Sequence, residues 1–191
     1  MSEEEYDHES CVNQKVKGVW IHRDVCIWKA EVTEMSYREF GERLEEFGDE
    51  EDAPQGVCPW ITTRYVNGHQ VDIWYDENFW SYHPVPSAMA TDAVEPLCGM
   101  LFITGGEDHT GKSMSLPDGV IADILKTYNV PDPGELGPYA KTWGMGFAFL
   151  MMGYKLVHFT CWDPDEDSRT LAEVLEDLVS QDENKEGEQE E

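Results

Sequence analysis

The segment Trp60–Tyr75 constrains the fold of this chain most strongly, because its sequence specifies a β-hairpin. Two runs rich in β-branched and aromatic residues, WITTRYV and HQVDIWY, flank the dipeptide Asn67-Gly68. Asn-Gly readily adopts the positive φ angles that a two-residue type I′ turn requires. We therefore expect an antiparallel pair of strands with Asn67 and Gly68 at its tip.

Other segments have the composition of strands. Residues 15–22 and 24–32 are predicted as two short strands joined at His22 to Asp24, and residues 97–104 and 154–161 as two more. Residues 84–96 contain three prolines and are predicted as a long irregular loop.

Helix signals alternate irregularly with these strands. Ser36 and Glu39 form an S-x-x-E capping box in a predicted helix over 35–48, and a second helix is predicted from Pro117 or Asp118 to Tyr128. Residues 168–179 have the apolar stripe of a surface helix. Residues 139–153 are apolar nearly all round, which favours a buried helix and leaves a buried strand as the alternative. The pattern predicts an α+β fold with a mostly antiparallel sheet and three to four helices.

The chain has 191 residues, which is long enough for one domain with a sizeable core. We expect a single domain over 15–180, with acidic disordered segments over 1–14 and 181–191. The chain has no apolar run of transmembrane length, its first residues are acidic, and its five cysteines lack a C-x-x-C pair. These features favour a cytoplasmic protein with free thiols and no membrane contact.

Residues 101–119 contain a pattern that is typical of nucleotide-binding proteins. An apolar run precedes the motif G-x-x-x-x-G-K-[ST], as in a P-loop. The residues that satisfy the motif, and that would bind the phosphates, are Gly106, Gly111, Lys112 and Ser113.

The surroundings of this motif argue against a phosphate site. A P-loop needs a helix that begins at the Gly-Lys-Ser, yet Pro117 and Gly119 follow too soon for such a helix. Glu107 and Asp108 would also repel a triphosphate. We favour a hairpin in which residues 107–110 form the turn and Lys112 offsets the nearby carboxylates, and we keep nucleotide binding as a minor alternative.

Two runs, YVNGHQVDIWYDEN and PLCGMLFITGGEDHTGKSMSLPDGVIADIL, resemble a family of uncharacterised domains common in phages and mobile elements. In that family a hairpin is followed by a loop, a buried strand ending in Gly, an acidic turn, and Ser-Leu before a short helix. The resemblance covers about residues 60–126. It implies a mobile-element origin and an accessory role, and it implies no catalytic residues.

The formal net charge of −27 is concentrated in three places, since residues 1–13, 45–52 and 163–191 together carry −22 of it. Such a chain should repel free nucleic acid and anionic membranes, so the expected partner is a host protein with a basic surface. Rigid carboxylates could also imitate DNA phosphates and block a nucleic-acid-binding or defence protein. The candidate contact residues lie in one acidic loop and one acidic helix: Glu45, Glu46, Asp49, Glu50, Glu51, Asp52, Glu173, Glu176 and Asp177.

The alternative function is that of a small-ligand-binding protein or enzyme with an aromatic pocket. An aromatic platform beside the 84–96 loop would be formed by Trp74, Phe79, Trp80 and Tyr82. The sequence marks neither a nucleophile elbow nor a paired acid and base, and its H-x-x-C pairs do not make a zinc site alone. We therefore expect no catalytic residue, metal or cofactor, and favour a non-enzymatic role.

Overall fold

The computed structural model of the chain describes residues 8–24, 27–47, 58–78, 86–90, 96–129 and 157–159, together with Cys161, Asp163, Arg169 and Glu173. The acidic loop over 48–57, the apolar segment 139–153 and nearly all of the predicted helix 168–179 lie outside these residues.

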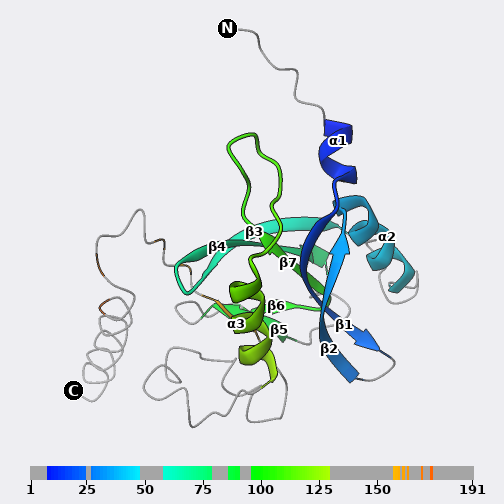
Figure 1. Ribbon diagram of the computed structural model, residues 1–191. Helices are drawn as coiled ribbons and strands as arrows, with labels where there is room; N and C mark the ends of the chain where they lie inside the picture. Colours follow the sequence, from blue (N-terminus) through cyan, green and yellow to red (C-terminus); the bar gives the residue numbers. More distant parts are fainter. Residues whose placement is uncertain are drawn as a thin grey trace, which may run out of the picture.

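A five-stranded antiparallel sheet forms the centre of the described part, with strand order β2-β1-β7-β4-β3 (Figure 1). Its strands are β1 (Val16–Asp24), β2 (Ile27–Met35), β3 (Pro59–Val66), β4 (His69–Asp76) and β7 (Leu101–Gly105). The predicted α+β class with a mostly antiparallel sheet is therefore confirmed.

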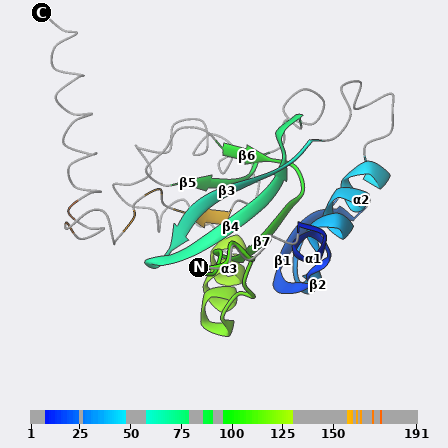
Figure 2. The same ribbon diagram turned by 90° about the horizontal axis from the view of Figure 1, so that it is seen from above.

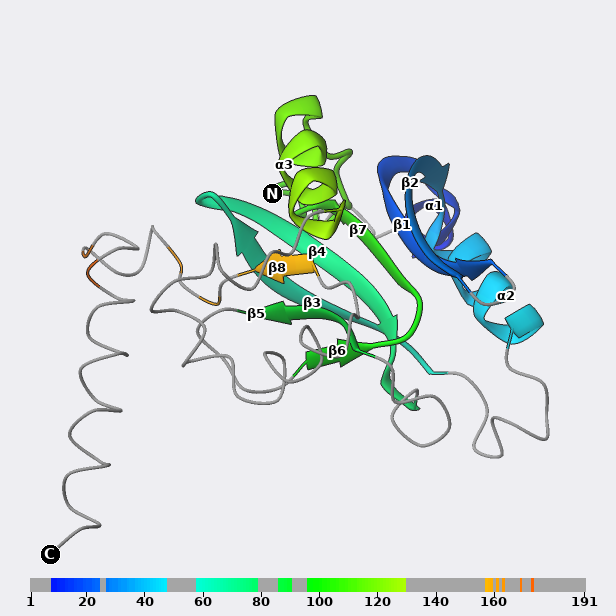
Figure 3. The ribbon, with the colours of Figure 1, turned by 90° about the horizontal axis from the view of Figure 1, so that it is seen from below.

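A smaller sheet and three helices complete the described part. The order β6-β5-β8 joins β6 (Pro96–Cys98), β5 (Pro86–Ala90) and β8 (Val157–Phe159), and the β5–β8 pair is parallel. In Figure 3 this sheet lies beside β3 and β4, at the end of the large sheet away from β1 and β2. The helices are α1 (His8–Asn13), α2 (Tyr37–Phe47) and α3 (Asp118–Asn129).

The hairpin predicted from Asn67-Gly68 is present as β3 and β4. Asn67 and Gly68 have φ angles of 50° and 77°, and Val66 pairs directly with His69 across the turn. Asn and Gly tolerate this left-handed conformation with little strain, so the turn sequence fixes the register of both strands.

The central strands of the large sheet, β1, β7 and β4, are buried on both faces because their side chains alternate between two cores. On one face, Val19, Ile73 and Ile103 pack against α3 and the smaller sheet. On the other face, Trp20 and Phe102 pack under Phe40 of α2. Figure 2 shows α2 and α3 on either side of β1.

The capping box of α2 forms as its sequence predicts. The Ser36 amide donates to the Glu39 carboxylate at 2.9 Å, and the Glu39 amide donates to Ser36 Oγ at 3.2 Å. Lys15 forms an ion pair with Glu39 at 2.6 Å, and this contact, together with the Ser36 amide, lowers the pKa of the Glu39 carboxyl. The start of α2 is therefore tied to the residues that lead into β1.

Two predictions about local structure are wrong. Residues 97–104 are not one strand, because the chain turns at Gly99, whose φ is +82°, and divides into β6 and β7 in different sheets. The predicted loop 84–96 contains β5, which is paired on both sides.

The described part of the leader 1–14 contains α1, which contacts α2. The disorder expected for the leader as a whole stays a prediction.

Gly18 and Gly119 give a matched test of the packing between β1 and β7. A Cβ on Gly18 would overlap the carbonyl oxygen of Ile103 and come within 2.8 Å of the Phe102 ring, whereas a Cβ on Gly119 meets nothing within 4 Å. We expect Gly18→Ala to lower the free energy of unfolding by about 1–3 kcal/mol or more. Gly119→Ala should be neutral or stabilising by up to about 1 kcal/mol. Urea denaturation of both variants measures the difference, and equal stabilities would contradict the packing described.

Candidate functional site

Residues 105–114 form a hairpin that extends β7 beyond the sheet, and it rises beside α1 in Figure 1. The Gly105 amide donates to the Met114 carbonyl at 2.8 Å and the Met114 amide donates to the Gly106 carbonyl at 3.1 Å. Glu107 and Ser113 form a further antiparallel bridge. The segment with the P-loop pattern is therefore a hairpin, and the next helix, α3, begins only at Asp118.

The tip of this hairpin is closed by one carboxylate. Asp108 accepts hydrogen bonds from the Thr110 amide at 2.8 Å, the Thr110 hydroxyl at 2.6 Å and the Lys112 amide at 3.1 Å. These bonds, led by the Thr110 hydroxyl, lower the pKa of Asp108 to about 2. The backbone N–H groups that would hold a phosphate in a P-loop thus serve a carboxylate of the same loop.

Lys112 contributes to the turn through its backbone. Its amide donates to Asp108, but its ammonium forms no ion pair within the part of the chain that the structure describes. The expectation that Lys112 would offset the nearby carboxylates therefore stays a prediction for its side chain. The residues proposed for nucleotide binding, Gly106, Gly111, Lys112 and Ser113, all belong to this hairpin.

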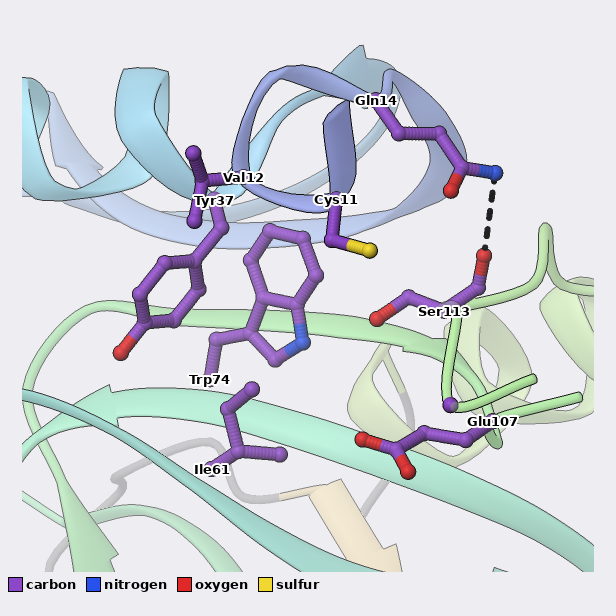
Figure 4. A pocket seen from close by; sticks show the side chains of 9 residues that line it. Cys11, Val12, Gln14, Tyr37, Ile61, Trp74, Glu107 and Ser113 are labelled. Carbon is purple, nitrogen blue, oxygen red and sulfur yellow. Dashed lines mark hydrogen bonds between the residues drawn. The ribbon is translucent and has the colours of Figure 1, made fainter. Parts of the chain in front are cut away.

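A cavity of about 250 Å³ lies between the hairpin, α1, the start of α2 and the face of the large sheet. Gln14 links two of its walls, because its side-chain amide donates to the Ser113 carbonyl at 3.4 Å (Figure 4). The lining residues come from segments far apart in the sequence: Cys11, Val12, Gln14, Tyr37, Ile61, Trp74, Glu107, Gly111 and Ser113.

Trp74 forms the inner wall of this cavity. Its side chain is 1% exposed and packs edge-to-face against Tyr37, Phe40 and Phe102, with ring centroids 5.1–6.0 Å away. Its indole nitrogen has no hydrogen-bond partner among the described residues. Figure 4 shows this nitrogen directed toward the space bounded by Cys11, Ser113 and Glu107.

The predicted aromatic platform requires correction at Trp74. This side chain lies in the core because β4 turns it toward α2, so it cannot belong to an exposed platform. The other three members, Phe79, Trp80 and Tyr82, lie outside the described residues. Trp74 faces the cavity only along one edge of its ring.

A second carboxylate lies beneath the hairpin. Asp72 is 2% exposed and accepts a hydrogen bond from the Thr63 hydroxyl at 2.9 Å. Burial raises the pKa of Asp72, the Thr63 bond opposes this shift, and the charge of Glu107 adds to it. This end of the sheet is therefore an environment that disfavours additional negative charge.

The acidic residues proposed for partner binding are described only in part. Glu45 and Glu46 are exposed in the last turn of α2, and Glu173 is exposed. The others, Asp49, Glu50, Glu51, Asp52, Glu176 and Asp177, lie outside the described residues.

A second, more open hollow of about 480 Å³ lies beside α2, lined by Trp20, His22, Glu31, Arg43, Glu46 and Met100. Arg43 lies over the Trp20 ring at 5.7 Å, and Trp20 stacks on His22. Glu31 approaches His22 Nε2 at 3.5 Å. The carboxylates of Glu46 in α2 and Glu31 in β2 thus border the Trp20 ring, over which the Arg43 guanidinium lies.

Sequence reasoning missed most of the cavity. Cys11, Val12 and Gln14 lie in a segment predicted to be disordered, and Ser113 is about a hundred positions away from them. The Ser113 contact with Gln14 brings these segments together, and three neighbouring bonds of Lys17, with Ser115 Oγ, the Leu116 amide and the Asp118 carboxylate, support it. None of these bonds has a signal in the local sequence.

No group of three or more potential metal ligands occurs among the described residues. In the same residues no helix is long and apolar enough to cross a membrane. Cys11, Cys58 and Cys98 form no disulfide, and burial raises the pKa of the Cys98 thiol to about 12.

Comparison with known proteins gave no match to a protein-family model, to a curated protein or to a solved structure.

The Asp108 turn predicts a specific loss of protection. In Asp108→Ala, the amides of Thr110 and Lys112 lose their acceptor, so their hydrogen exchange should accelerate several-fold. His109→Ala, at the same tip, should leave that exchange unchanged. Because the folded-state pKa of Asp108 is lowered, its contribution in the wild type should persist at neutral pH and disappear as pH falls toward about 2. Equal exchange in both variants would show that the carboxylate does not close the turn.

The raised pKa of Asp72 predicts a stabilising substitution. Asp72→Asn keeps an acceptor for Thr63 and removes a buried charge, so it should raise the melting temperature at neutral pH. A carboxyl with a raised folded-state pKa destabilises the protein while ionised, so the advantage of the variant should shrink as pH falls through that pKa. The difference in melting temperature between Asp72→Asn and the wild type is measured from neutral to acid pH. A difference that grows on acidification would contradict a raised pKa of Asp72.

Proposed function

We propose that this chain is a non-enzymatic acidic protein that binds a host protein through its acidic surfaces and modulates or inhibits it. The observation that carries the proposal is the position of Glu45 and Glu46 at the end of α2, beside the hollow that Glu31 and Glu46 border.

These acids stand where they cost stability. The C-terminal end of a helix has a partial negative charge, and each acid there costs about 0.3–1 kcal/mol at an exposed site. The last turn of α2 contains no base, and four more acids follow at positions 49–52. A basic partner would relieve this repulsion, so the charge arrangement favours association over the stability of the free chain.

The same acids are held by a packed helix. The side chains of Phe40 and Leu44 in α2 are at most 2% exposed. The Ser36–Glu39 capping box fixes the N-terminal end of the same helix. Carboxylates on an anchored helix keep a constant spacing, as a mimic of DNA phosphates requires. This favours α2 as a contact surface.

The neighbouring hollow suits a basic side chain of the partner. Arg43 already lies over Trp20 there, so the site accepts a guanidinium above its aromatic floor. Glu31 and Glu46 would supply the carboxylates for a second cation.

The partner class follows from this chemistry. Proteins that bind nucleic acid present clustered Lys and Arg, and they gain much of their affinity from neutralising phosphates. We propose such a protein, including a defence nuclease, as the partner, with no direct binding of nucleic acid or membrane by this chain. The resemblance to phage and mobile-element domains remains a prediction and is consistent with action in the host cytoplasm.

The stability cost gives the first test. Glu45→Gln/Glu46→Gln should raise the free energy of unfolding by about 0.5–1.5 kcal/mol, because both charges leave the negative end of the helix. Glu34→Gln/Glu77→Gln removes the same charge from exposed sites elsewhere and should have a smaller effect. Denaturation at low salt measures both. A destabilised Glu45→Gln/Glu46→Gln variant would contradict the proposed cost.

Partner binding gives the second test. Wild type and both double variants serve as baits in a host lysate, and captured proteins are quantified at low and high salt. We expect the wild type and the Glu34→Gln/Glu77→Gln control to capture the same set of basic proteins, and Glu45→Gln/Glu46→Gln to capture several-fold less of them. High salt should release these proteins from all baits. Equal capture by all three baits would overturn the proposed role of α2.

A further inference from the structure

The cavity beside the hairpin carries an inference that is independent of the acidic surface. We propose that it binds a small amino-substituted heteroaromatic molecule, uncharged or cationic and about the size of a nucleobase. The indole of Trp74, the carboxylate of Glu107 and the size and charge of the cavity favour such a ligand.

The indole N–H of Trp74 requires an acceptor that the described protein does not supply. A buried donor without a partner costs about 1–3 kcal/mol. The ring cannot turn to find another partner, because Tyr37, Phe40 and Phe102 hold it from the core side. The N–H is thus a fixed donor at the inner wall, and a ligand must present an acceptor to it.

Glu107 supplies the complementary acceptor. Its carboxylate lies at the mouth of the cavity on the hairpin, and Figure 4 shows it facing the same space as the Trp74 nitrogen and the Ser113 hydroxyl. A ligand with an N–H donor close to an acceptor atom would satisfy both groups. Amino groups next to a ring nitrogen have this arrangement, while Val12, Ile61 and Tyr37 provide apolar contact with the ring.

The local charge excludes anions. Glu107 and the buried Asp72 lie close enough for the first to raise the pKa of the second, and none of the described residues that line the cavity is basic. A phosphate would therefore be repelled at the same hairpin whose sequence matches a phosphate-binding pattern. The proposed ligand is therefore a molecule that resembles a nucleobase and has no phosphate.

The size of the cavity sets the upper limit. Pockets for drug-sized ligands occupy about 300–1,000 Å³, and this one measures about 250 Å³. A single heteroaromatic ring system fits this space. The Trp74 nitrogen is buried, so binding of the proposed ligand requires that side chains lining the cavity move to admit its acceptor.

The test is a titration followed through the indole N–H resonances of isotope-labelled protein, with Trp74→Phe assigning the Trp74 signal. The probes are adenine, cytosine and aminopyridine. Purine lacks the amino group, and AMP adds a phosphate. We expect at least one amino-substituted probe to shift the Trp74 resonance, with a micromolar to millimolar dissociation constant. Purine and AMP should bind at least several-fold more weakly than that probe.

Variants at exposed positions make the result specific. Glu107→Gln should weaken binding of that probe about tenfold, whereas Glu77→Gln, at an exposed carboxylate outside the cavity, should not. Glu107 is exposed, so its substitution should leave the fold intact, and the change in affinity is measured in protein that retains Trp74. Trp74→Phe serves only to assign the Trp74 signal. The proposal is overturned if no amino-substituted probe shifts the Trp74 signal, if AMP binds more tightly than adenine, or if Glu107→Gln binds as the wild type does.

Discussion

The insertion of β7 between β1 and β4 is the constraint on which the rest of the structure depends. β1–β2 and β3–β4 are each local hairpins, and β7 joins them into one sheet through Phe102, which pairs with Trp20 on one side and Trp74 on the other. All five residues of β7 are buried. Gly18 leaves the room that the Phe102 ring needs over β1. Because Phe102 and Phe40 fix the indole of Trp74 from the core side, the same packing sets the direction of its N–H and hence the inner wall of the cavity.

Local chemistry determined which parts of the fold were predictable from the sequence. The Asn67-Gly68 turn and the Ser36–Glu39 capping box were correct because each is decided by residues within four positions of one another. The division of residues 97–104 into β6 and β7 was missed, since the apolar run is continuous and only the positive φ of Gly99 separates two different sheets. The cavity was missed for a related reason: Gln14 and Ser113 meet only after the sheet has formed.

The hairpin at residues 105–114 shows why a short motif does not establish a function. The pattern of a P-loop specifies glycines and a Lys-Ser pair, and a tight acidic turn needs similar glycines for its backbone. Gly111 has a φ of +77°. Asp108 accepts hydrogen bonds from the amides of Thr110 and Lys112, which could otherwise donate to a bound anion. The decisive difference is the position of the following helix, which begins at Asp118 and not at Lys112.

α2 has acidic residues in its first and last turns, and the helix dipole has opposite effects on the two groups. Glu39 lies in the first turn, where it completes the capping box, pairs with Lys15 and faces the positive end of the helix. Glu45 and Glu46 lie in the last turn, where the helix dipole opposes them and no base accompanies them. Stability explains the first acid but not the other two. Since an exposed turn accepts Lys or Gln as readily as Glu, the fold alone does not require acids at the end of α2, and the proposed contact surface rests on this excess of acids.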